Sequence, residues 1–431
     1  MKVLTKWLAA GAAIAAMGGL AYVAMTPAKA ADKGGLDHGM ADLEERVAEL
    51  EATTARKGNR RVSVTISGVV HKGILYHNHD GLPGDGKMSI YDGSMDPSRV
   101  RVSGEAKMRS DWAAGFVIEI AYAGDSARGL DTGKALLSLG APDSTNEFQI
   151  GERGTVTRHS FVYVTSPAGK VSIGQQSMST DGIIEVSLAN TQVAGKPLST
   201  MPLNVGGAMA GLAVAYDGYR ANALRYDTPT IGGFTGSASW TDTDSWDAAL
   251  RWAGEAGGFR MAFGVGYRDQ SSRTLVQVLN ILDALTFDID GSHKATSASG
   301  SIKHMGSGLF ATAYYSRVKY EMTGELAILP PLFSVSFPLG SETMTGYGGQ
   351  LGVERNWFGV GATTLFVEWQ KMAGDTAMAD LTSYGLGMVQ SFDSLGLDLY
   401  LAARRYEPST TGICVICTDT DVVTGGARIR F

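Results

Sequence analysis

Charged side chains recur at every second position between Arg99 and Arg109. One parity of this segment holds Arg99, Arg101, Ser103, Glu105, Lys107 and Arg109. The other parity holds small or apolar residues, from Val100 to Met108. Because side chains on a β-strand point to alternate faces, this segment predicts a strand with a ladder of cations on one face. Such a ladder can set the preference of a wall for ions of one sign.

Covalent catalysis would need a nucleophile beside a base. His159 and Ser160 are neighbours in the sequence, but neighbours on a strand point to opposite faces and cannot form a catalytic dyad. We therefore expect no catalytic residues and no enzymatic activity. His77 and His79 stand in a polar segment where histidines are usually solvated, so we predict neither a metal site nor a cofactor.

Strict alternation also runs through three consecutive segments between Phe234 and Arg268. Apolar residues take one parity, and an aromatic residue stands near most ends of that face: Phe234, Trp240, Trp246, Trp252, Phe259 and Tyr267. An apolar face bounded by aromatic residues is typical of strands that cross a bilayer, where aromatic girdles lie at both interfaces. A soluble β-sandwich also alternates, so this stretch alone leaves both folds open.

The N-terminal end has the pattern of a secretory signal peptide. Lys2 and Lys6 precede an apolar run from Trp7 to Val23, and Ala28-Lys29-Ala30 forms a small-residue cleavage site. We expect residues 1–30 to be removed after Ala30, with a single membrane anchor as the alternative. The segment contains three lysines and no acid, so the formal charge changes from −6 to −9 on cleavage. An acidic exported protein is a poor candidate for binding nucleic acid.

The last residues alternate again, from Val423 to the terminal Phe431. A C-terminal alternating strand that ends in phenylalanine resembles the signature of Gram-negative outer-membrane β-barrels. The resemblance implies location in the cell outer membrane and recognition of Phe431 by the barrel-insertion machinery. After residue 30 the sequence contains no apolar run long enough for a membrane-spanning helix. We therefore expect an all-β transmembrane protein.

Sixteen strand candidates follow Val62. They are 62–75, 98–110, 115–123, 158–166, 169–176, 219–227, 233–241, 245–253, 258–268, 294–304, 308–320, 344–354, 359–371, 382–392, 395–406 and 421–431. An even number returns both ends of a closed barrel to the periplasmic side. Short connectors such as 167–168 alternate mostly with long ones such as 269–293 and 321–343. This pattern predicts a 16-stranded antiparallel β-barrel over residues 62–431, with short periplasmic turns and long outer loops.

In strand number and loop order the chain resembles the trimeric general porins. The resemblance also rests on the turn Pro167-Ala-Gly-Lys170 that leads to Gly174-Gln175-Gln176, and on the strand end Arg225-Tyr226-Asp227. It implies a homotrimer, surrounded by outer-membrane lipid and lipopolysaccharide, whose water-filled channel passes small hydrophilic solutes and ions by diffusion. It also implies that the loop after strand five, Ser177 to Gly218, folds inward and constricts the pore. A substrate-selective, anion-preferring channel and a structural envelope barrel are the alternatives.

The residues of the constriction follow from parity and from this resemblance. Alternation places Arg251 on the water-facing parity, and Arg225 joins it if Tyr226 belongs to an aromatic girdle. The porin resemblance implies basic wall residues that face acidic residues on the inward loop. We select Arg99, Arg101, Lys107, Arg109, Arg225 and Arg251 on the wall, against Asp181 and Glu185 on the loop. The alternative is that these charges only keep the lumen hydrated.

Residues 31–61 are predicted to form a leader with a short amphipathic helix. Leu43, Val47 and Leu50 share one edge of a helix over residues 42–54. About two heptads are too short for an isolated stable helix, so the segment predicts a small periplasmic coiled coil between copies. A solvated helical linker and a tether to the cell wall are the alternatives.

Two outer segments are unexpectedly apolar. Leu275 to Leu285 has helical spacing, and Leu326 to Leu339 is almost continuously apolar. Apolar surface of this size predicts packing between loops that narrows the pore mouth, and a docking site for a partly apolar solute or a lid over the pore are the alternatives. In the last outer loop, Cys414 and Cys417 are expected to form a disulfide in an exported protein. A zinc site would need further ligands, and none lies nearby in the sequence.

Overall fold

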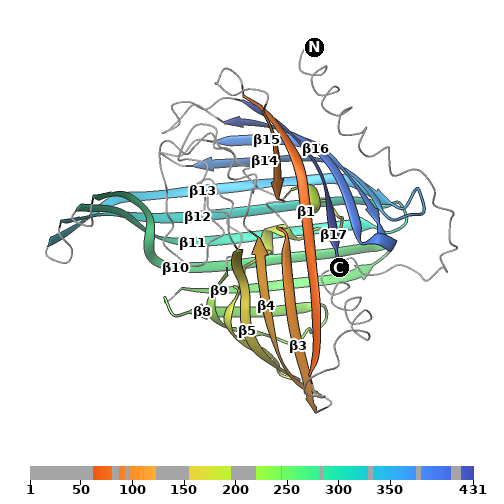
Figure 1. Cartoon of the computed structure of the whole chain (residues 1–431), viewed down its shortest axis with the longest axis horizontal. Coiled ribbons are helices and arrows are strands. Elements are labelled where there is room, and N and C mark those ends of the chain that lie inside the picture. Colours follow the sequence, from red (N-terminus) through yellow and green to blue (C-terminus); the bar gives the residue numbers. More distant parts are fainter. Residues whose placement is uncertain are drawn as a thin grey trace.

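The computed structural model describes most of the chain from Val62 onward. The described residues are 62–79, 87–92, 97–109, 111–122, 155–195, 220–243, 245–281, 285–328, 333–374, 380–408 and 419–431. Their strands form one antiparallel sheet that curves around a central space (Figure 1). Within these ranges no helix is long and apolar enough to cross a membrane.

The elements follow the chain in order around the sheet. The strands are β1 (Ser63–His79), β2 (Lys87–Asp92), β3 (Arg99–Arg109), β4 (Trp112–Tyr122), β5 (Thr155–Ser166), β6 (Gly169–Ser177), β7 (Arg220–Asp227), β8 (Phe234–Thr241), β9 (Trp246–Ala256), β10 (Phe259–Ile281), β11 (Leu285–His304), β12 (Leu309–Ile328), β13 (Phe333–Arg355), β14 (Thr363–Gly374), β15 (Leu381–Phe392), β16 (Leu397–Pro408) and β17 (Thr420–Arg430). Short 3-10 helices are η4 (Ile183–Glu185), η5 (Gln192–Ala194) and η6 (Asp393–Leu395).

Strand β1 closes the sheet into a barrel. One edge of β1 pairs with β17 over Val69–His79. The other edge pairs with β3 over Ser63–Val69 and with β2 over Lys72–His77. Because β2 and β3 lie end to end against the same neighbour, they count as one barrel strand. The prediction of a closed 16-stranded antiparallel barrel is confirmed.

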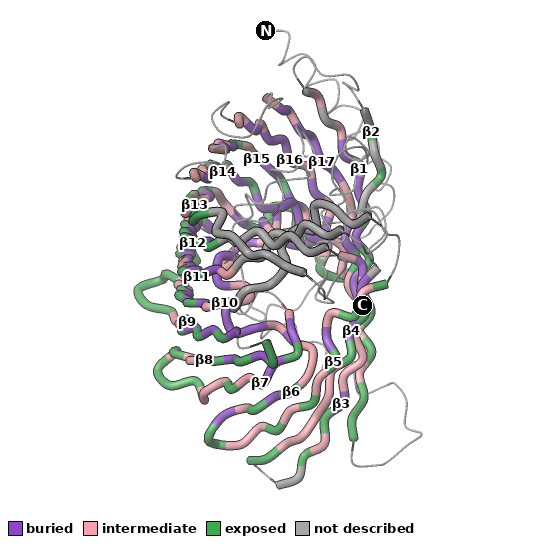
Figure 2. The backbone as a smooth tube through the Cα atoms, turned by 90° about the vertical axis from the view of Figure 1, so that its left-hand side faces the viewer, coloured by how far each residue is buried: buried purple, intermediate pink, exposed green. Residues whose placement is uncertain are grey.

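The outer face of the barrel is apolar and the inner face is polar. On β8, β9 and β10 the outward residues Trp240, Leu250 and Val265 are 45–50% exposed, whereas the inward Ser239, Asp247 and Arg268 are at most 4% exposed. Buried and exposed residues follow one another along these strands (Figure 2). A soluble sandwich would bury its apolar face, so the exposed apolar surface supports the transmembrane interpretation of the alternation.

Aromatic side chains gather at both ends of this apolar face. Near the outer ends of the lipid-facing bands of β9 and β10, the ring centroids of Trp246 and Tyr267 lie 5.5 Å apart. Near the short turns, those of Phe234 and Trp252 lie 6.2 Å apart. Two such groups mark the two interfaces of a bilayer with water.

Four strands continue well beyond the rest of the barrel (Figure 1). β10 pairs with β9 only as far as Asp269, and β13 pairs with β14 only from Met344. Beyond these points β10–β13 pair with one another up to the hairpin tips. The prediction of loops at 269–293 and 321–343 is therefore wrong, and so is the helical interpretation of Leu275 to Leu285.

The physical reason lies in the irregular register of β10. Three register shifts occur between Gln270 and Leu279. Each bulge adds a residue to one strand and changes the face to which the following side chains belong. The two-residue period is therefore lost in the sequence although the backbone remains paired. The predicted signal peptide, the helix at 42–54 and the Cys414–Cys417 disulfide lie outside the described residues.

The closing pair predicts a position that tolerates no side chain. The amides of Gly68 and Phe431 each donate to the carbonyl oxygen of the other, at 2.7 and 3.0 Å. A Cβ atom at residue 68 would lie 2.4 Å from Cζ of Phe431 and 2.9 Å from the carbonyl oxygen of Arg99. Gly68→Val should therefore destabilise the closed barrel by about 1–3 kcal/mol, the usual cost of overpacking.

The measurement is the temperature at which the band of the folded barrel shifts to the position of the unfolded chain in gel electrophoresis. Val70→Ala is the control, because Val70 lies two residues along the same outward face and is 49% exposed. Equal melting of both variants and the wild type would contradict the close packing of Phe431 on Gly68.

Candidate functional site

Residues 178–195, here called the inner loop, leave the end of β6 and run along the inside of the barrel. Helix η4 contacts β10, β11 and β12, and η5 contacts β15, β16 and β17. Ile183 and Val193, one from each helix, are at most 2% exposed. This part of the connector after the fifth barrel strand therefore folds inward, as the porin resemblance implied.

Two glycines of β10 allow the loop to approach the wall. A Cβ atom at Gly266 would lie 2.7 Å from Cγ2 of Thr180, and one at Gly264 would lie 3.1 Å from Cδ1 of Ile183. Larger residues here would push the start of the loop toward the centre of the pore.

The first anchor of the inner loop is the carboxylate of Asp247 on β9. The backbone amides of Ser179 and Thr180 donate to its two oxygens at 3.1 and 2.7 Å, and the Thr180 hydroxyl donates at 2.7 Å. Ser239 donates a further hydrogen bond. Asp247 is completely buried. A buried carboxylate is stable only when such donors replace its water.

The second anchor is Asn190, which joins three strands of the opposite wall. Its backbone amide donates to Oε2 of Glu354 on β13 at 2.8 Å. Its side-chain amide donates to Oδ1 of Asp398 on β16 at 2.9 Å, and its side-chain oxygen accepts from Arg428 on β17 at 3.1 Å. Lys303 pairs with Glu354 and Arg428 with Asp398. The wall charges at this anchor are therefore paired.

The third anchor lies at η5. Arg404 on β16 donates to the carbonyl oxygen of Ala194 at 2.8 Å and pairs with Glu368. The Thr191 hydroxyl donates to Gln350 on β13 at 2.9 Å. Together the three anchors attach the described part of the loop to β9 and to β13, β16 and β17.

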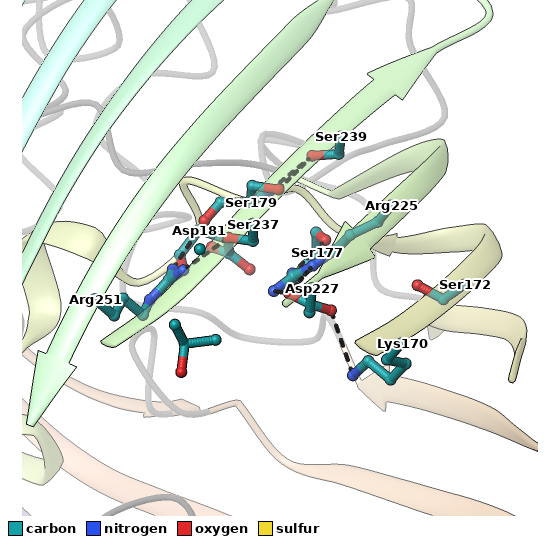
Figure 3. Close-up of polar contacts among 12 residues, drawn as sticks. Lys170, Ser172, Ser177, Ser179, Asp181, Arg225, Asp227, Ser237, Ser239 and Arg251 are labelled. Atoms are coloured by element: carbon teal, nitrogen blue, oxygen red, sulfur yellow. Dashed lines mark hydrogen bonds and ion pairs between the residues drawn. The ribbon is translucent and has the colours of Figure 1, made fainter. Parts of the chain in front are cut away.

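Two of the selected arginines serve the base of this loop. Nη1 of Arg225 donates to the carbonyl oxygen of Ser177 at 2.9 Å, and its Nη2 pairs with Asp227 at 2.7 Å. Nη2 of Arg251 donates to the carbonyl oxygens of Ser179 at 2.9 Å and Asp181 at 2.7 Å. Figure 3 shows both guanidinium groups turned toward the start of the loop.

The selected loop acids differ in their surroundings. Oδ2 of Asp181 lies 3.3 Å from Nη2 of Arg220, a residue that strand alternation did not select. The carbonyl oxygen of Glu185 accepts a hydrogen bond from Gln192 within the loop.

The upper part of the arginine ladder meets a buried carboxylate on β4. Nε of Arg101 lies 2.7 Å from Oε2 of Glu119, and Nε of Arg99 lies 3.6 Å from the same oxygen. From β5, Nε of Arg158 lies 2.8 Å from Oε1, and Nδ1 of His159 lies 3.5 Å from it. Glu119 is 1% exposed. Several cationic groups thus converge on one carboxylate.

A β-bulge brings Arg158 into this group. Glu119 pairs with His159 and Ile120 with Thr157, so Arg158 is the extra residue of β5. A bulge can turn two consecutive side chains toward one face, and here both Arg158 and His159 approach Glu119. Simple alternation could not predict this, because it assigns neighbours to opposite faces.

The lower part of the ladder lies toward the short turns. Lys107 is exposed, and Glu105 accepts a hydrogen bond from Tyr163 at 3.0 Å. The side chain of Arg109 lies outside the described residues, although its backbone belongs to β3. Of the selected ladder residues, Arg99 and Arg101 are thus the ones that meet Glu119. We call Arg99, Arg101, Arg158, His159 and Arg220, together with Glu119, the arginine cluster.

Comparison with known proteins decides the family. A model of the Gram-negative porins matches residues 8–411. The chain belongs to the Gram-negative porin family. No curated protein matches its sequence. The porin fold and family together make this protein an outer-membrane channel for diffusion.

Solved structures with the same barrel have very different sequences. The anion-selective porin from Comamonas acidovorans is 17% identical with a TM-score of 0.56, and the match covers 86% of this porin and 100% of that chain. The outer membrane channel DcaP of Acinetobacter baumannii is 11% identical with a TM-score of 0.53, covering 88% and 100%. A loop L8 deletion mutant of OmpT from Vibrio cholerae is 16% identical with a TM-score of 0.52, covering 86% and 100%. These similarities show a shared fold.

The Asp247 anchor predicts how the inner loop can be released. Asp247→Asn replaces one carboxylate oxygen with an NH2 group. This group is a hydrogen-bond donor, and it would face a backbone amide of Ser179 or Thr180 that is also a donor. Hydrogen bonds to a charged group contribute about 1.5–3 kcal/mol each, so we expect the start of the loop to move and the conductance of single channels to become larger or more variable. The barrel itself should fold, because Asp247 pairs with the loop through its side chain alone.

Single-channel recording in a planar bilayer measures this change. Asp242→Asn is the matched control, because Asp242 is an exposed acid in the adjoining turn. Unchanged conductance and unchanged current noise in Asp247→Asn would show that this anchor does not position the loop.

Proposed function

We propose that this porin passes small hydrophilic solutes and ions by passive diffusion and prefers anions. The observation that carries the preference is the composition of the arginine cluster. Among the described residues it brings Arg99, Arg101, Arg158 and Arg220 together with the carboxylates of Glu119 and Asp181. An excess of positive charge at a narrow, low-dielectric passage raises the local concentration of anions.

The position of the inner loop supports this role for the cluster. The described residues of the loop lie against the wall between β9 and β17, whereas Arg99 and Arg101 stand on β3. We infer that the opening adjoins this second part of the wall. Arg101 retains a side-chain exposure of 40%, against 1% for Glu119. Solutes in the opening therefore meet the guanidinium group before the carboxylate.

The fold comparison agrees with this proposal without carrying it. The porin from Comamonas acidovorans is described as anion-selective, but at 17% identity the likeness extends to the fold alone. A substrate-selective anion channel is the second candidate, favoured by the same convergence of guanidinium groups, which suits carboxylate or phosphate groups.

Charge substitutions of opposite sign test the preference. Arg101→Gln should lower the anion preference because it removes a cation, and Glu119→Gln should raise it because it removes an anion. The double variant R101Q/E119Q should return close to the wild type, since its net charge is unchanged. The measurement is the reversal potential of purified protein in a planar bilayer under a salt gradient.

Arg355→Gln is the control, because Arg355 is exposed at the far end of β13. Equal reversal potentials in all variants would show that the arginine cluster does not determine the ion preference. A cation-biased wild type would contradict the anion preference. No conductance from folded barrels would favour a structural envelope protein.

We propose that the barrel has no catalytic activity. His159 lies between Glu119 and Ser177, with its Nε2 3.3 Å from the Ser177 hydroxyl oxygen. The arrangement has the order of a catalytic triad, but Arg101 and Arg158 hold the two oxygens of Glu119 at 2.7 and 2.8 Å. A carboxylate neutralised in this way is a poor partner for an imidazolium ion.

We also propose a homotrimer whose contacts lie on the outer face of β5–β7. Val162, Ile173 and Leu224 lie side by side there and are 49–58% exposed. Toward the outer ends of the same strands, outward positions hold Ser160, Gln175 and Asn222. Outward aromatic residues are instead found from β8 to β15: Trp240, Trp246, Tyr267, Tyr315, Tyr347, Trp369 and Tyr384. A sector without an outer girdle suits contact with another copy better than contact with a lipid interface.

Tryptophan substitutions distinguish the proposed trimer contact on β5–β7 from the lipid-facing wall on β14. The double variant V162W/I173W should disrupt the trimer, because a packed interface cannot accept two large rings. Val367→Trp on β14 should leave the trimer intact, because lipid chains adapt; Val367 is 56% exposed, close to the 55% of Val162. Native mass spectrometry of the purified protein measures the assembly, and a trimeric V162W/I173W would exclude this interface.

We propose cleavage of a signal peptide after Ala30, a short periplasmic coiled coil over residues 42–54, and recognition of Phe431 by the barrel-insertion machinery. The cell outer membrane supplies lipid and lipopolysaccharide around the barrel. A disulfide between Cys414 and Cys417 would stiffen the last outer loop.

A further inference from the structure

Two aromatic side chains face the lumen beside the arginine cluster. The inward positions of β5 after His159 are Phe161 and Tyr163, whereas Val162 between them faces outward and is 55% exposed. The ring centroids of His159 and Phe161 lie 5.9 Å apart, and those of Phe161 and Tyr163 lie 6.3 Å apart. The rings therefore continue the arginine cluster along the wall, toward the short turn that follows β5.

The ring of Tyr163 lies over the neighbouring strand β4. Gly115 on β4 pairs with Tyr163, and a Cβ atom at Gly115 would lie 2.5 Å from Cζ and from the hydroxyl oxygen of Tyr163. Beyond this glycine the Tyr163 hydroxyl donates to Oε2 of Glu105 on β3 at 3.0 Å. The ring thus crosses β4 in the space that a side chain at residue 115 would fill, and it forms part of the wall surface.

These two rings are more accessible than the aromatic residues on the opposite part of the wall. Within the described residues of β10–β17, the inward Phe and Tyr side chains are at most 5% exposed: Phe310, Tyr314, Tyr320, Phe366, Tyr400 and Tyr406. Three of them belong to one buried cluster with Val193 of η5. Phe161 and Tyr163 have intermediate exposure. A solute in the lumen can therefore touch the rings on β5.

Cations border the two rings at both ends. On the outer side, Arg101 keeps a side-chain exposure of 40% although it pairs with Glu119. On the side of the short turns, Nζ of Lys170 lies 6.0 Å from the centre of the Tyr163 ring, and the Lys170 side chain is 42% exposed. A guanidinium group can bind a carboxylate through two parallel hydrogen bonds, and aromatic rings attract each other by offset stacking. Groups suited to both contacts adjoin here.

We propose that Phe161 and Tyr163, here called the aromatic platform, form with the arginine cluster a subsite for aromatic carboxylates. The carboxylate of the solute binds Arg101, and its ring stacks on Phe161. This inference rests on the proposed anion preference and names the class of anion that the passage retains best. A small anion uses the positive charge alone, whereas a planar aromatic acid uses both the charge and the stacking surface.

Block of the chloride current through the full-length porin in a planar bilayer tests the subsite. The probes are benzoate, cyclohexanecarboxylate and acetate at neutral pH; the first two have the same charge and similar size, but only benzoate is planar and aromatic. Benzoate should block the wild type at the lowest concentration. Phe161→Leu should raise the half-blocking concentration of benzoate about two- to tenfold, the range expected for the loss of one aromatic pair. Tyr163→Leu is a second variant with the same expected direction, should Phe161→Leu fail to fold.

Three further variants separate stacking from charge. Phe116→Leu on β4 is the matched control, because Phe116 pairs with Val162 on the outward face and should not affect block by benzoate. Arg101→Gln should weaken block by all three carboxylates by a similar factor, because it removes a charge and leaves the rings in place. Tyr163→Phe should keep the preference for benzoate, since it retains the ring and loses only the hydrogen bond to Glu105.

The outcomes distinguish this inference from the proposed function. Equal block by benzoate and cyclohexanecarboxylate in an anion-preferring wild type would overturn the aromatic platform and leave the proposed function standing. Unchanged block by benzoate in Phe161→Leu would do the same. A wild type that does not conduct, or that prefers cations, would refute the proposed function, and saturation-transfer NMR of benzoate with the purified protein then decides the subsite. Transfer to the benzoate ring that is lost in Phe161→Leu supports the platform, and equal transfer in both proteins overturns it.

Discussion

The pairing of β1 with β17 is the constraint on which the rest of this structure depends. A strand edge in hydrocarbon has no water to satisfy its amides and carbonyls, so a sheet that crosses a membrane must close on itself. Here the ladder runs from Val69 and Arg430 to His79 and Thr420, and Gly68 lets the ring of Phe431 pack over the junction. Closure separates an interior filled with water from a lipid exterior. Every strand must then alternate between two solvents.

The polar interior has a second use, because its charged groups hold the inner loop. Asp247, Glu354 and Asp398 accept hydrogen bonds from backbone or side-chain groups of that loop. A buried carboxylate without such partners would lower the free energy of unfolding by roughly several kcal/mol, as any unpaired buried charge does. The loop and the wall therefore stabilise each other. The loop thereby engages Asp247, Glu354 and Asp398, whereas we propose that the arginine cluster faces the opening.

Arg225 and Arg251 illustrate the same division of roles. Their parity is as predicted, since both side chains point inward, but each binds carbonyl oxygens at the start of the loop. Arg158 and Arg220 take part in the cluster although alternation did not select them. The difference arises because parity defines only the face of a strand. It does not define which inward-facing group meets a folded segment, a carboxylate or water.

Much of the barrel could be predicted because two solvents impose a strong period of two on its strands. The alternation in β8, β9 and β10, the even strand number and the inward connector after β6 all follow from this constraint and from the porin resemblance. The tall hairpins β10–β11 and β12–β13 could not be predicted, because beyond the membrane no lipid enforces alternation and bulges in β10 disturb it. There the pairing of neighbouring backbones maintains the strands.

The sequence by itself determined the fold class, the family and the face of most wall residues, because each of these depends on local pattern or on similarity along the chain. Only the tertiary structure decided which charges work together. Glu119 meets Arg158 through a bulge, and Asn190 meets Asp398 across more than two hundred residues of chain. Contacts of this kind depend on strand register and on the path of the inner loop. Neither leaves a periodic signal in the sequence, because both are set by distant backbones that meet only when the barrel closes.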